Sequence, residues 1–162
     1  MSGGVVLVRK NIYSASVFGT DATYSGSTLD NLIKSTIYSQ TPQKLRDKMM
    51  DVSFQLYLSG NITRKMFALT YTMAGFGNNN GVAEGKPLQH VSRSKVFNNL
   101  STHWWLSSQT PSNFVWIVQA GGNYALQDSN SNSNGVVPAF AIPSKTPYDP
   151  TPNTDGSYNL IL

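Results

Sequence analysis

The amino-acid sequence predicts an α+β domain, with helices first and a meander of short antiparallel strands after them. Three observations predict this class. Apolar residues recur at helical spacing near residue 30, and they alternate with polar residues after residue 51. The final third consists of short apolar runs separated by turn residues. Helices segregated from strands along the chain are typical of α+β proteins.

The first 50 residues predict one strand and two helices. Val5–Val8 is a short apolar run that favours a strand. Ser27, with Asp30 three residues later, is a helix N-cap signal. A second helix is expected after Thr41-Pro42, with Thr as the N-cap and Pro at the first helical position. The first helix presents one apolar stripe, formed by Leu29, Leu32, Ile33 and Ile37.

The middle of the chain predicts two strands and a long irregular segment. Apolar and polar residues alternate over 52–59, which is typical of a strand with one buried face. Residues 66–71 form a continuous apolar run that favours a central strand. Residues 75–103 are rich in Gly and Asn and have no periodicity. A loop of this length is usually functional or specific to the fold.

The final third predicts four strands and a tail. Pro138 lies inside the last run and suggests an edge strand or a bulge. We expect residues 1–23 to form an N-terminal strand or arm, residues 24–143 the domain, and residues 144–162 an extended Pro-rich tail. The four predicted strands are Trp104–Leu106, Phe114–Val118, Tyr124–Gln127 and Val136–Ile142.

Composition argues against an enzyme. The 162 residues include no cysteine, and only 12% are charged, about half of the share usual in globular domains. Glu84 is the only glutamate, and His90 and His103 are the only histidines. Acid–base, metal and nucleophile chemistry draws mostly on these residue types. We therefore expect no cofactor and no metal site, and we interpret both histidines as structural.

The net charge of +4 is unevenly distributed. Residues 1–95 carry +6 and residues 96–162 carry −2. The basic residues are scattered, so no nucleic-acid partner is expected. The N-terminal apolar run is too short for a signal peptide, and no stretch approaches the roughly 20 residues that span a membrane.

Two motifs carry a resemblance to a known family. Residues 104–108 read Trp-Trp-Leu-Ser-Ser, and residues 135–140 read Gly-Val-Val-Pro-Ala-Phe. They resemble the W-W-L-R-S-P and G-V-R-P-A-F motifs of a widespread bacterial and phage domain family with a C-type-lectin-like fold. Ser107 and Val137 stand where that family commonly has Arg. The resemblance extends over residues 24–143.

The resemblance implies a C-type-lectin-like fold of two N-terminal helices and a short-stranded meander. The calcium-site tripeptides of sugar-binding C-type lectins are missing, so calcium-dependent sugar binding is not expected. For the three tryptophans, a stacking platform for sugars or bases is the alternative to a place in the core. The expected structural core comprises Trp104, Trp105, Leu106, Trp116, Pro138 and Phe140.

A candidate ligand-binding surface lies on the last meander, where amide side chains and a tyrosine gather. Such groups form hydrogen bonds to glycans or proteins at small desolvation cost, and the alternative is that they only make tolerant turns. In the loop, Glu84 with Asn78–Asn80 suggests either a cation site or a simple polar loop. The candidate surface comprises Asn113, Asn123, Tyr124, Gln127, Asp128, Asn130, Asn132 and Asn134.

These observations favour a non-enzymatic phage virion protein on the particle exterior, either a head decoration or a tail or fibre tip. It would be made in the host cytoplasm without a signal peptide and would assemble as a homo-oligomer with other virion proteins. The alternatives are a host-surface adhesin that recognises glycan or protein, and a bacterial surface glycan-binding protein. The residues expected to mediate assembly are Val5, Val6, Leu7, Val8, Leu160, Ile161 and Leu162.

Overall fold

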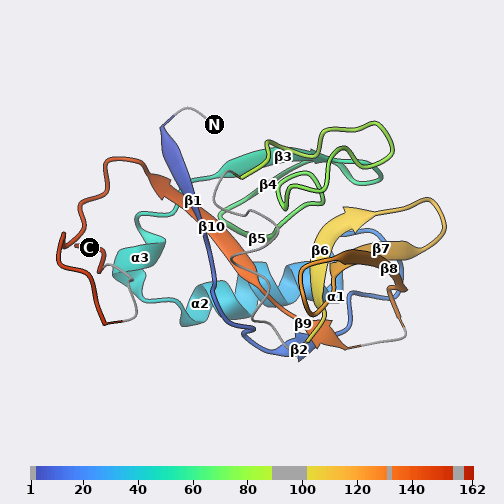
Figure 1. The fold of residues 1–162 in the computed structure, drawn as a ribbon, viewed down its shortest axis with the longest axis horizontal. Coiled ribbons are helices and arrows are strands. Elements are labelled where there is room, and N and C mark those ends of the chain that lie inside the picture. The colour runs from blue at the N-terminus through green and yellow to red at the C-terminus, as the bar shows by residue number, and fades with distance from the viewer. Residues whose placement is uncertain (1–2, 89–101, 131–132, 155–158) are drawn as a thin grey trace.

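The computed structural model of the chain describes residues 3–88, 102–130, 133–154 and 159–162. The described residues form a three-stranded sheet, a five-stranded sheet, a hairpin and a short helical section (Figure 1).

The three-stranded sheet joins both ends of the domain. Its order is β1 (Gly4–Val8), β10 (Pro138–Pro143) and β5 (Met66–Ala68), all antiparallel. Because β10 lies in the centre without a register shift, the expectation that Pro138 marks an edge strand or a bulge is wrong. Proline lacks the N–H of a ladder hydrogen bond, and here it occupies the first position of the strand, where it is tolerated.

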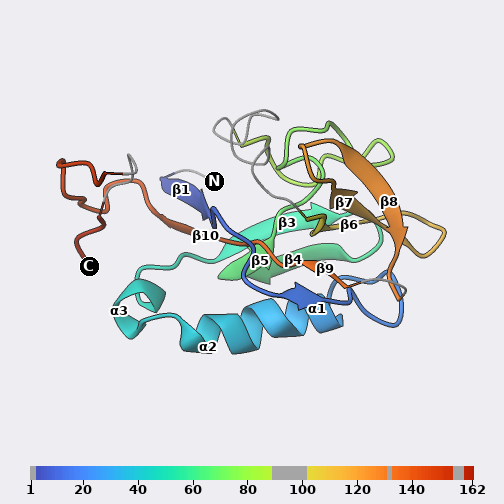
Figure 2. The ribbon, with the colours of Figure 1, turned by 60° about the horizontal axis from the view of Figure 1, so that its bottom comes forward.

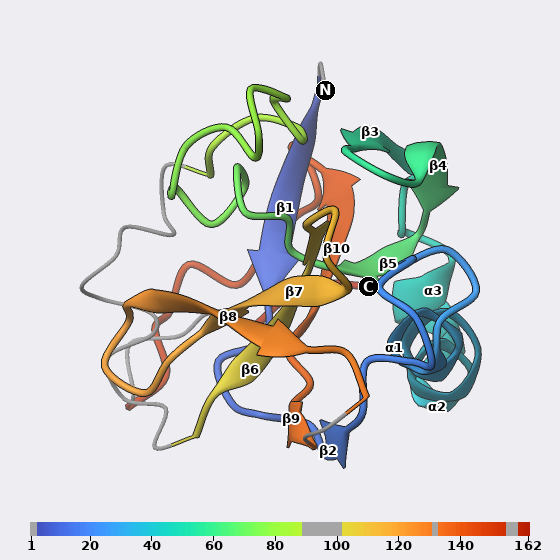
Figure 3. The same cartoon turned by 90° about the vertical axis from the view of Figure 1, so that its right-hand side faces the viewer.

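The five-stranded sheet contains the predicted meander. Its order is β2-β9-β6-β7-β8, and β6, β7 and β8 pair antiparallel in sequence. The chain leaves this sheet at Val136–Val137, which are both buried, and enters the three-stranded sheet as β10. Figure 3 shows β1 and β10 crossing the direction of β7 and β8. The strand bounds are β2 (Ala15–Ser16), β6 (Trp104–Gln109), β7 (Phe114–Val118), β8 (Tyr124–Asp128) and β9 (Asn134–Gly135).

The hairpin consists of β3 (Val52–Leu56) and β4 (Gly60–Arg64). In β3 the burial alternates as the sequence predicts. The strand β4 is not predicted, because only Ile62 in it is buried and its strand character comes from pairing with β3.

The helices are short and lie along one side of the sheets (Figure 2). One continuous helical stretch comprises α1 (Thr28–Asn31), the π-helical η1 (Leu32–Ile37) and α2 (Tyr38–Gln40). The predicted cap is confirmed, because the Ser27 hydroxyl accepts a hydrogen bond of 3.0 Å from the Asp30 amide. A single further turn, α3 (Gln43–Arg46), follows.

The described part of the chain is therefore β-rich, with 12% helix and 35% strand. The prediction of an α+β, C-type-lectin-like fold of two N-terminal helices and a meander is wrong. Local patterns located the helical stripe, but they did not show that β1 and β2 pair with β10 and β9 from the other end of the domain. These pairings make the first two strands part of two different sheets.

Most of the residues expected to form the structural core are buried. Trp104, Trp105 and Leu106 are fully buried, and Pro138 is buried as well. The Trp105 indole donates a hydrogen bond of 2.7 Å to the Ser16 carbonyl, which ties β6 to β2. The remaining two, Trp116 and Phe140, are half-buried.

The residues expected to mediate assembly lie in two separate places. Val5–Val8 form β1, an edge strand that is paired with β10, and Leu7 and Val8 line a groove of about 360 Å³ beside α2 and α3. The tail beyond Pro143 turns back on itself, since the Ile161 amide donates a 2.9 Å hydrogen bond to the Pro147 carbonyl. Leu160 is half-buried, whereas Ile161 and Leu162 are exposed.

Candidate functional site

The outward side of β7 and β8 exposes apolar side chains. In the antiparallel register Trp116 lies opposite Leu126, Phe114 opposite Asp128, and Val118 opposite Tyr124. Paired residues point to the same side of a sheet, and so do alternate residues along each strand. Phe114, Tyr124 and Leu126 are 40%, 47% and 45% exposed, respectively. This side of the sheet is therefore only partly covered by the described part of the chain, although Val118 on it is buried.

Two aromatic residues from the loop after β5 join these strands. The Tyr71 ring centroid lies 4.6 Å from that of Trp116 and 5.3 Å from that of Tyr124. The Phe76 ring lies 5.1 Å from Tyr124, in an edge-to-face arrangement. Aromatic pairs at such distances stabilise each other beyond the burial of their area. We call this surface the aromatic face; its residues are Tyr71, Phe76, Phe114, Trp116, Tyr124 and Leu126.

A hydrogen-bonded asparagine supports the aromatic face from below. The Trp116 indole donates to Asn79 Oδ1 at 3.0 Å, and Asn79 is almost completely buried. The Asn79 amide nitrogen in turn donates to Glu84 Oε1 at 3.0 Å and to the Gln109 carbonyl at 2.8 Å. Because the nitrogen has these two acceptors, the orientation of the Asn79 amide is fixed.

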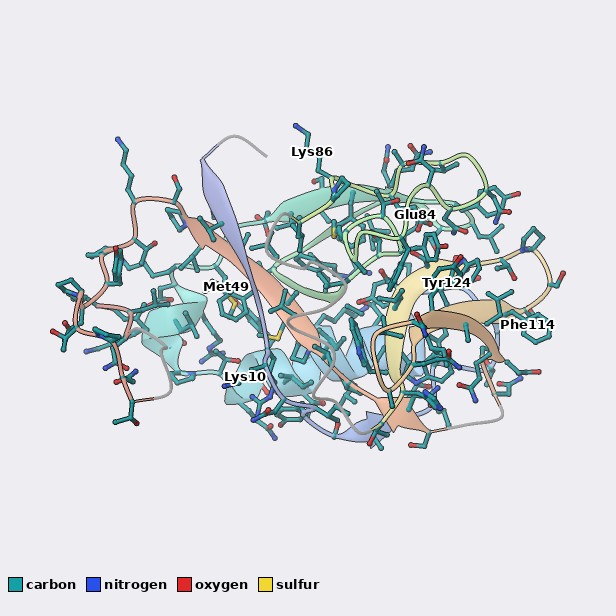
Figure 4. The ribbon with its side chains drawn as sticks, in the orientation of Figure 1. Lys10, Met49, Glu84, Lys86, Phe114 and Tyr124 are labelled. Atoms are coloured by element: carbon teal, nitrogen blue, oxygen red, sulfur yellow. The ribbon has the colours of Figure 1, made fainter. Side chains whose placement is uncertain are left out.

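Glu84 lies at the centre of this network and is fully buried. Its Oε1 also accepts a hydrogen bond of 2.9 Å from the Tyr57 amide, and its Oε2 accepts one from the Ser108 hydroxyl. Burial raises the pKa of Glu84, and the hydrogen bonds from Ser108, Asn79 and Tyr57 only partly oppose this effect. Figure 4 shows Glu84, Tyr124 and Phe114 at the β6–β8 end of the molecule, away from Lys10 and Met49.

The same loop is bound to Glu84 through its backbone as well. The Glu84 carbonyl accepts a hydrogen bond from the Thr70 hydroxyl, and the Glu84 amide donates to Thr72 Oγ1 at 3.0 Å. The cation-site alternative is therefore not favoured, because both carboxylate oxygens of Glu84 and the Asn79 oxygen already accept protein hydrogen bonds. In the described residues no group of three or more His, Cys, Asp or Glu could hold a metal ion.

A second buried carboxylate joins the helix to the hairpin. Asp30 accepts hydrogen bonds of 2.8 Å from Arg64 Nε and from Arg64 Nη2, and one of 3.1 Å from Lys34 Nζ. Burial acts to raise the pKa of Asp30, but the hydrogen bonds from Arg64, Gly26 and Lys34 outweigh it, so the pKa is lowered. This arrangement stabilises the fold and lies apart from the residues that form the aromatic face.

The structure joins some members of the predicted amide surface and separates others. Asn113 and Asn123 are exposed and precede different strands, and Asn132 lies outside the described residues. Gln127 and Asn134 bond to each other at 2.7 Å.

Two other members of the predicted surface, Asn130 and Asp128, are joined by a hydrogen bond. Asn130 donates to the Thr20 carbonyl at 3.1 Å, and the exposed Asp128 accepts from the Asn130 amide at 2.9 Å. Tyr124 is the member that belongs to the aromatic face.

The remaining sequence candidates show no catalytic arrangement. His103 Nδ1 accepts a hydrogen bond of 3.3 Å from the Ala120 amide, and His90 lies outside the described residues.

None of the helices that the structure describes is long and apolar enough to cross a membrane.

Sequence reasoning missed most of the aromatic face. Alternation along β7 and β8 signals that Phe114 shares a side with Trp116, and that Leu126 shares one with Tyr124. No local pattern places Tyr71 and Phe76 beside them, because this contact depends on the path of an irregular loop.

Comparisons with known proteins identify the family of the chain. Neither the curated proteins nor the solved structures contain a match. A family model described as "Domain of unknown function (DUF6273)" matches residues 2–144, which include every strand described above. The chain therefore belongs to the DUF6273 family.

Proposed function

We propose that this protein is a non-enzymatic structural protein displayed on the outside of a phage particle, and that its aromatic face attaches to a glycan or protein on a cell surface. The observation that carries the attachment is the exposure of Phe114, Tyr124 and Leu126 on one side of β7 and β8. Contiguous exposed apolar patches usually mark interaction sites.

The chemistry of the aromatic face suits such recognition. Tyrosine and tryptophan offer a rigid ring for stacking and a polar atom for hydrogen bonding, so they contribute contact area at a small entropy cost. Asp128, at the end of β8, is the charged residue paired opposite Phe114. A ligand that presents apolar faces and hydroxyl or amide groups would therefore find partners here.

The titratable groups support a non-enzymatic function. The Glu84 carboxylate is fully enclosed and has hydrogen-bond donors on both oxygens. The His103 ring accepts a hydrogen bond from the Ala120 backbone amide, which does not orient or polarise the ring as a carboxylate would. A general acid or base must reach the proton that it transfers, and the enclosed Glu84 carboxylate is not placed to do so.

Attachment is tested by measuring the binding of purified protein to bacterial cell walls and to a glycan array. Tyr124→Ala should lower the binding at least ten-fold, because it removes the exposed ring of the aromatic face. Tyr148→Ala is the matched control, since this tyrosine is 55% exposed in the tail and should leave the binding unchanged. Absence of binding by the wild type, or equal loss in both variants, would refute attachment through this face.

Display on a particle needs a separate test. Immunogold labelling and quantitative mass spectrometry of purified particles of a phage that encodes the chain should show many copies on the exterior. If the protein binds cell walls but is absent from particles, the alternative of a bacterial surface glycan-binding protein replaces the virion proposal.

The non-enzymatic proposal has its own test. It would be overturned if the protein turned over any substrate and this activity were lost on changing His103.

A further inference from the structure

We propose that Glu84 is a positioning residue for the aromatic face, which holds the Trp116 ring through Asn79 and holds it more firmly when its carboxyl group is ionised. The link to ligand binding rests on the proposed function of the aromatic face. The coupling between Glu84 and the ring does not, and it can be tested without any ligand.

The first step is the hydrogen-bond chain itself. Glu84 Oε1 accepts from Asn79 Nδ2 at 3.0 Å, and Asn79 Oδ1 accepts from Trp116 Nε1 at 3.0 Å. Glu84 and Asn79 are 0% and 1% exposed, so water does not compete for these bonds. Trp116 is half-buried and contacts the rings of Tyr71 and Tyr124. A change in the Asn79 amide is therefore transmitted directly to the exposed surface.

The second step is the nature of the group at the end of the chain. A buried polar network with these donors could be completed by an amide, which would accept from Tyr57 and Asn79 and donate to Ser108. A carboxylate at this position has a larger desolvation cost. A glutamine could therefore support Asn79 structurally as well as Glu84 does. Only a group that gains and loses a proton, such as Glu84, can make the position of Asn79 depend on pH.

The third step is the surroundings of the carboxyl group. Its neighbours from the β3–β4 turn, the loop and β6 are the Tyr57 amide, Asn79 and the Ser108 hydroxyl, and none of these carries a charge. No Lys, Arg or His in the described residues forms an ion pair with Glu84. Figure 4 shows Lys86, two residues away, pointing out from the molecule. Burial therefore remains the main influence on this group, and it raises the pKa of Glu84.

The expected direction follows from the strength of the bonds. Hydrogen bonds to an ionised carboxylate are about twice as strong as those to a neutral oxygen. When the carboxyl group is protonated, the hydrogen bonds that Oε1 accepts from the Tyr57 amide and from Asn79 become weaker. Asn79 and Trp116 are then less firmly held. As the pH rises through the pKa of Glu84, the ring should become more firmly positioned.

The experiment follows the three tryptophan indole N–H signals by NMR in the ligand-free protein between pH 4 and 8. The Trp116 signal, assigned with Trp116→Phe, should titrate with a midpoint above the ordinary glutamate value. The Trp104 and Trp105 signals serve as internal controls, since Trp105 is bonded to the Ser16 carbonyl. In Glu84→Gln the Trp116 signal should no longer titrate, and in Asn79→Ala it should lose its coupling to Glu84.

The inference is overturned if the wild-type Trp116 signal does not titrate while the protein is folded, or if it titrates equally in Glu84→Gln. If Glu84→Gln does not fold, Asn79→Ala decides the matter, because Trp116 should no longer follow the titration of Glu84 when the connecting amide is absent.

A second measurement separates this inference from the proposed function. For a cell-wall or glycan ligand found by the binding tests, wild-type affinity should rise roughly five-fold with pH, the ratio expected between a neutral and a charge-assisted hydrogen bond. The affinity of Glu84→Gln should stay flat over the same range. If no ligand binds but Trp116 titrates as expected, the attachment proposal fails and the positioning of the ring by Glu84 stands. A ligand affinity that changes equally in both proteins would contradict the role of Glu84 in binding.

Discussion

Replacing Arg64 by methionine should destabilise the protein by about 2–3 kcal/mol. Methionine keeps much of the apolar packing of the arginine stem but removes the guanidinium group. That group makes two hydrogen bonds of 2.8 Å to the Asp30 carboxylate, which is completely buried. The substitution therefore leaves a buried negative charge with fewer partners.

The magnitude follows from what remains around Asp30. Removal of one partner of a buried ion pair typically costs about 3–5 kcal/mol. Here Lys34 Nζ at 3.1 Å and the Gly26 amide at 2.9 Å still bind the carboxylate, so the expected cost of about 2–3 kcal/mol lies at or just below the lower end of that range. The loss should be measured as a change in the free energy of unfolding from urea denaturation followed by circular dichroism.

Lys65→Met is the control on the neighbouring residue. Lys65 forms an ion pair of 3.9 Å with Asp51, and both side chains are well exposed. Exposed pairs contribute roughly 0–1 kcal/mol, so this variant should change stability by about 1 kcal/mol or less.

A double-mutant cycle tests the cause. In an Asp30→Asn background, Arg64→Met should cost less than about 1 kcal/mol, because no buried charge is left behind. A cost below about 0.5 kcal/mol in the wild-type background, or an equal cost in both backgrounds, would refute the reasoning.

Three further predictions concern pH, packing and assembly. Because burial raises the pKa of Glu84, the contribution of this group to stability is present below its unfolded-state pKa and is lost as the pH rises through its folded-state pKa. Glu84→Gln should therefore flatten the curve of stability against pH between these two pKa values. Gly135→Ala should cost about 1–2 kcal/mol, because a Cβ there would lie 2.7 Å from Ile12 Cδ1. We also propose that the exposed Ile161 and Leu162 hold subunits of a homo-oligomer together, so changing both to serine should lower the mass measured by light scattering.

Each of these predictions has an opposing result. A stability curve of Glu84→Gln parallel to that of the wild type would show that Glu84 does not titrate differently in the folded protein. If Ile12→Ala fails to restore any stability to Gly135→Ala, the close contact is not the cause. A monomeric wild type would remove the basis for assembly through the tail.

Local signals predicted the elements whose patterns are complete in themselves. The Ser27 cap and the apolar stripe at helical spacing located the helical stretch within one residue of its start. Alternation predicted β3, where each buried position faces the same side. These elements carry their own periodicity, so the sequence could reveal them without knowledge of their partners.

Pairing between distant segments could not be predicted in the same way. The sequence predicts an N-terminal strand or arm without a partner, whereas the five residues of β1 align with β10 throughout. The sequence offers Glu84 as a possible cation ligand, but in the structure Tyr57, Asn79 and Ser108 contact it from three different segments. The loop that brings Tyr71 to Trp116 has no period at all. In each case the decisive contact joins residues whose local patterns are independent of each other.

The central position of β10 has a consequence for how the chain folds. The strands β1 and β5 are synthesised early, but the strand that separates them is among the last parts of the domain to be made. Until then, both early strands present unpaired backbone groups, which favour association with other chains. The order of synthesis thus makes the newly made chain vulnerable to aggregation. A chain shortened before Pro138 would lose β10 itself, and β1 would lose the strand with which it pairs.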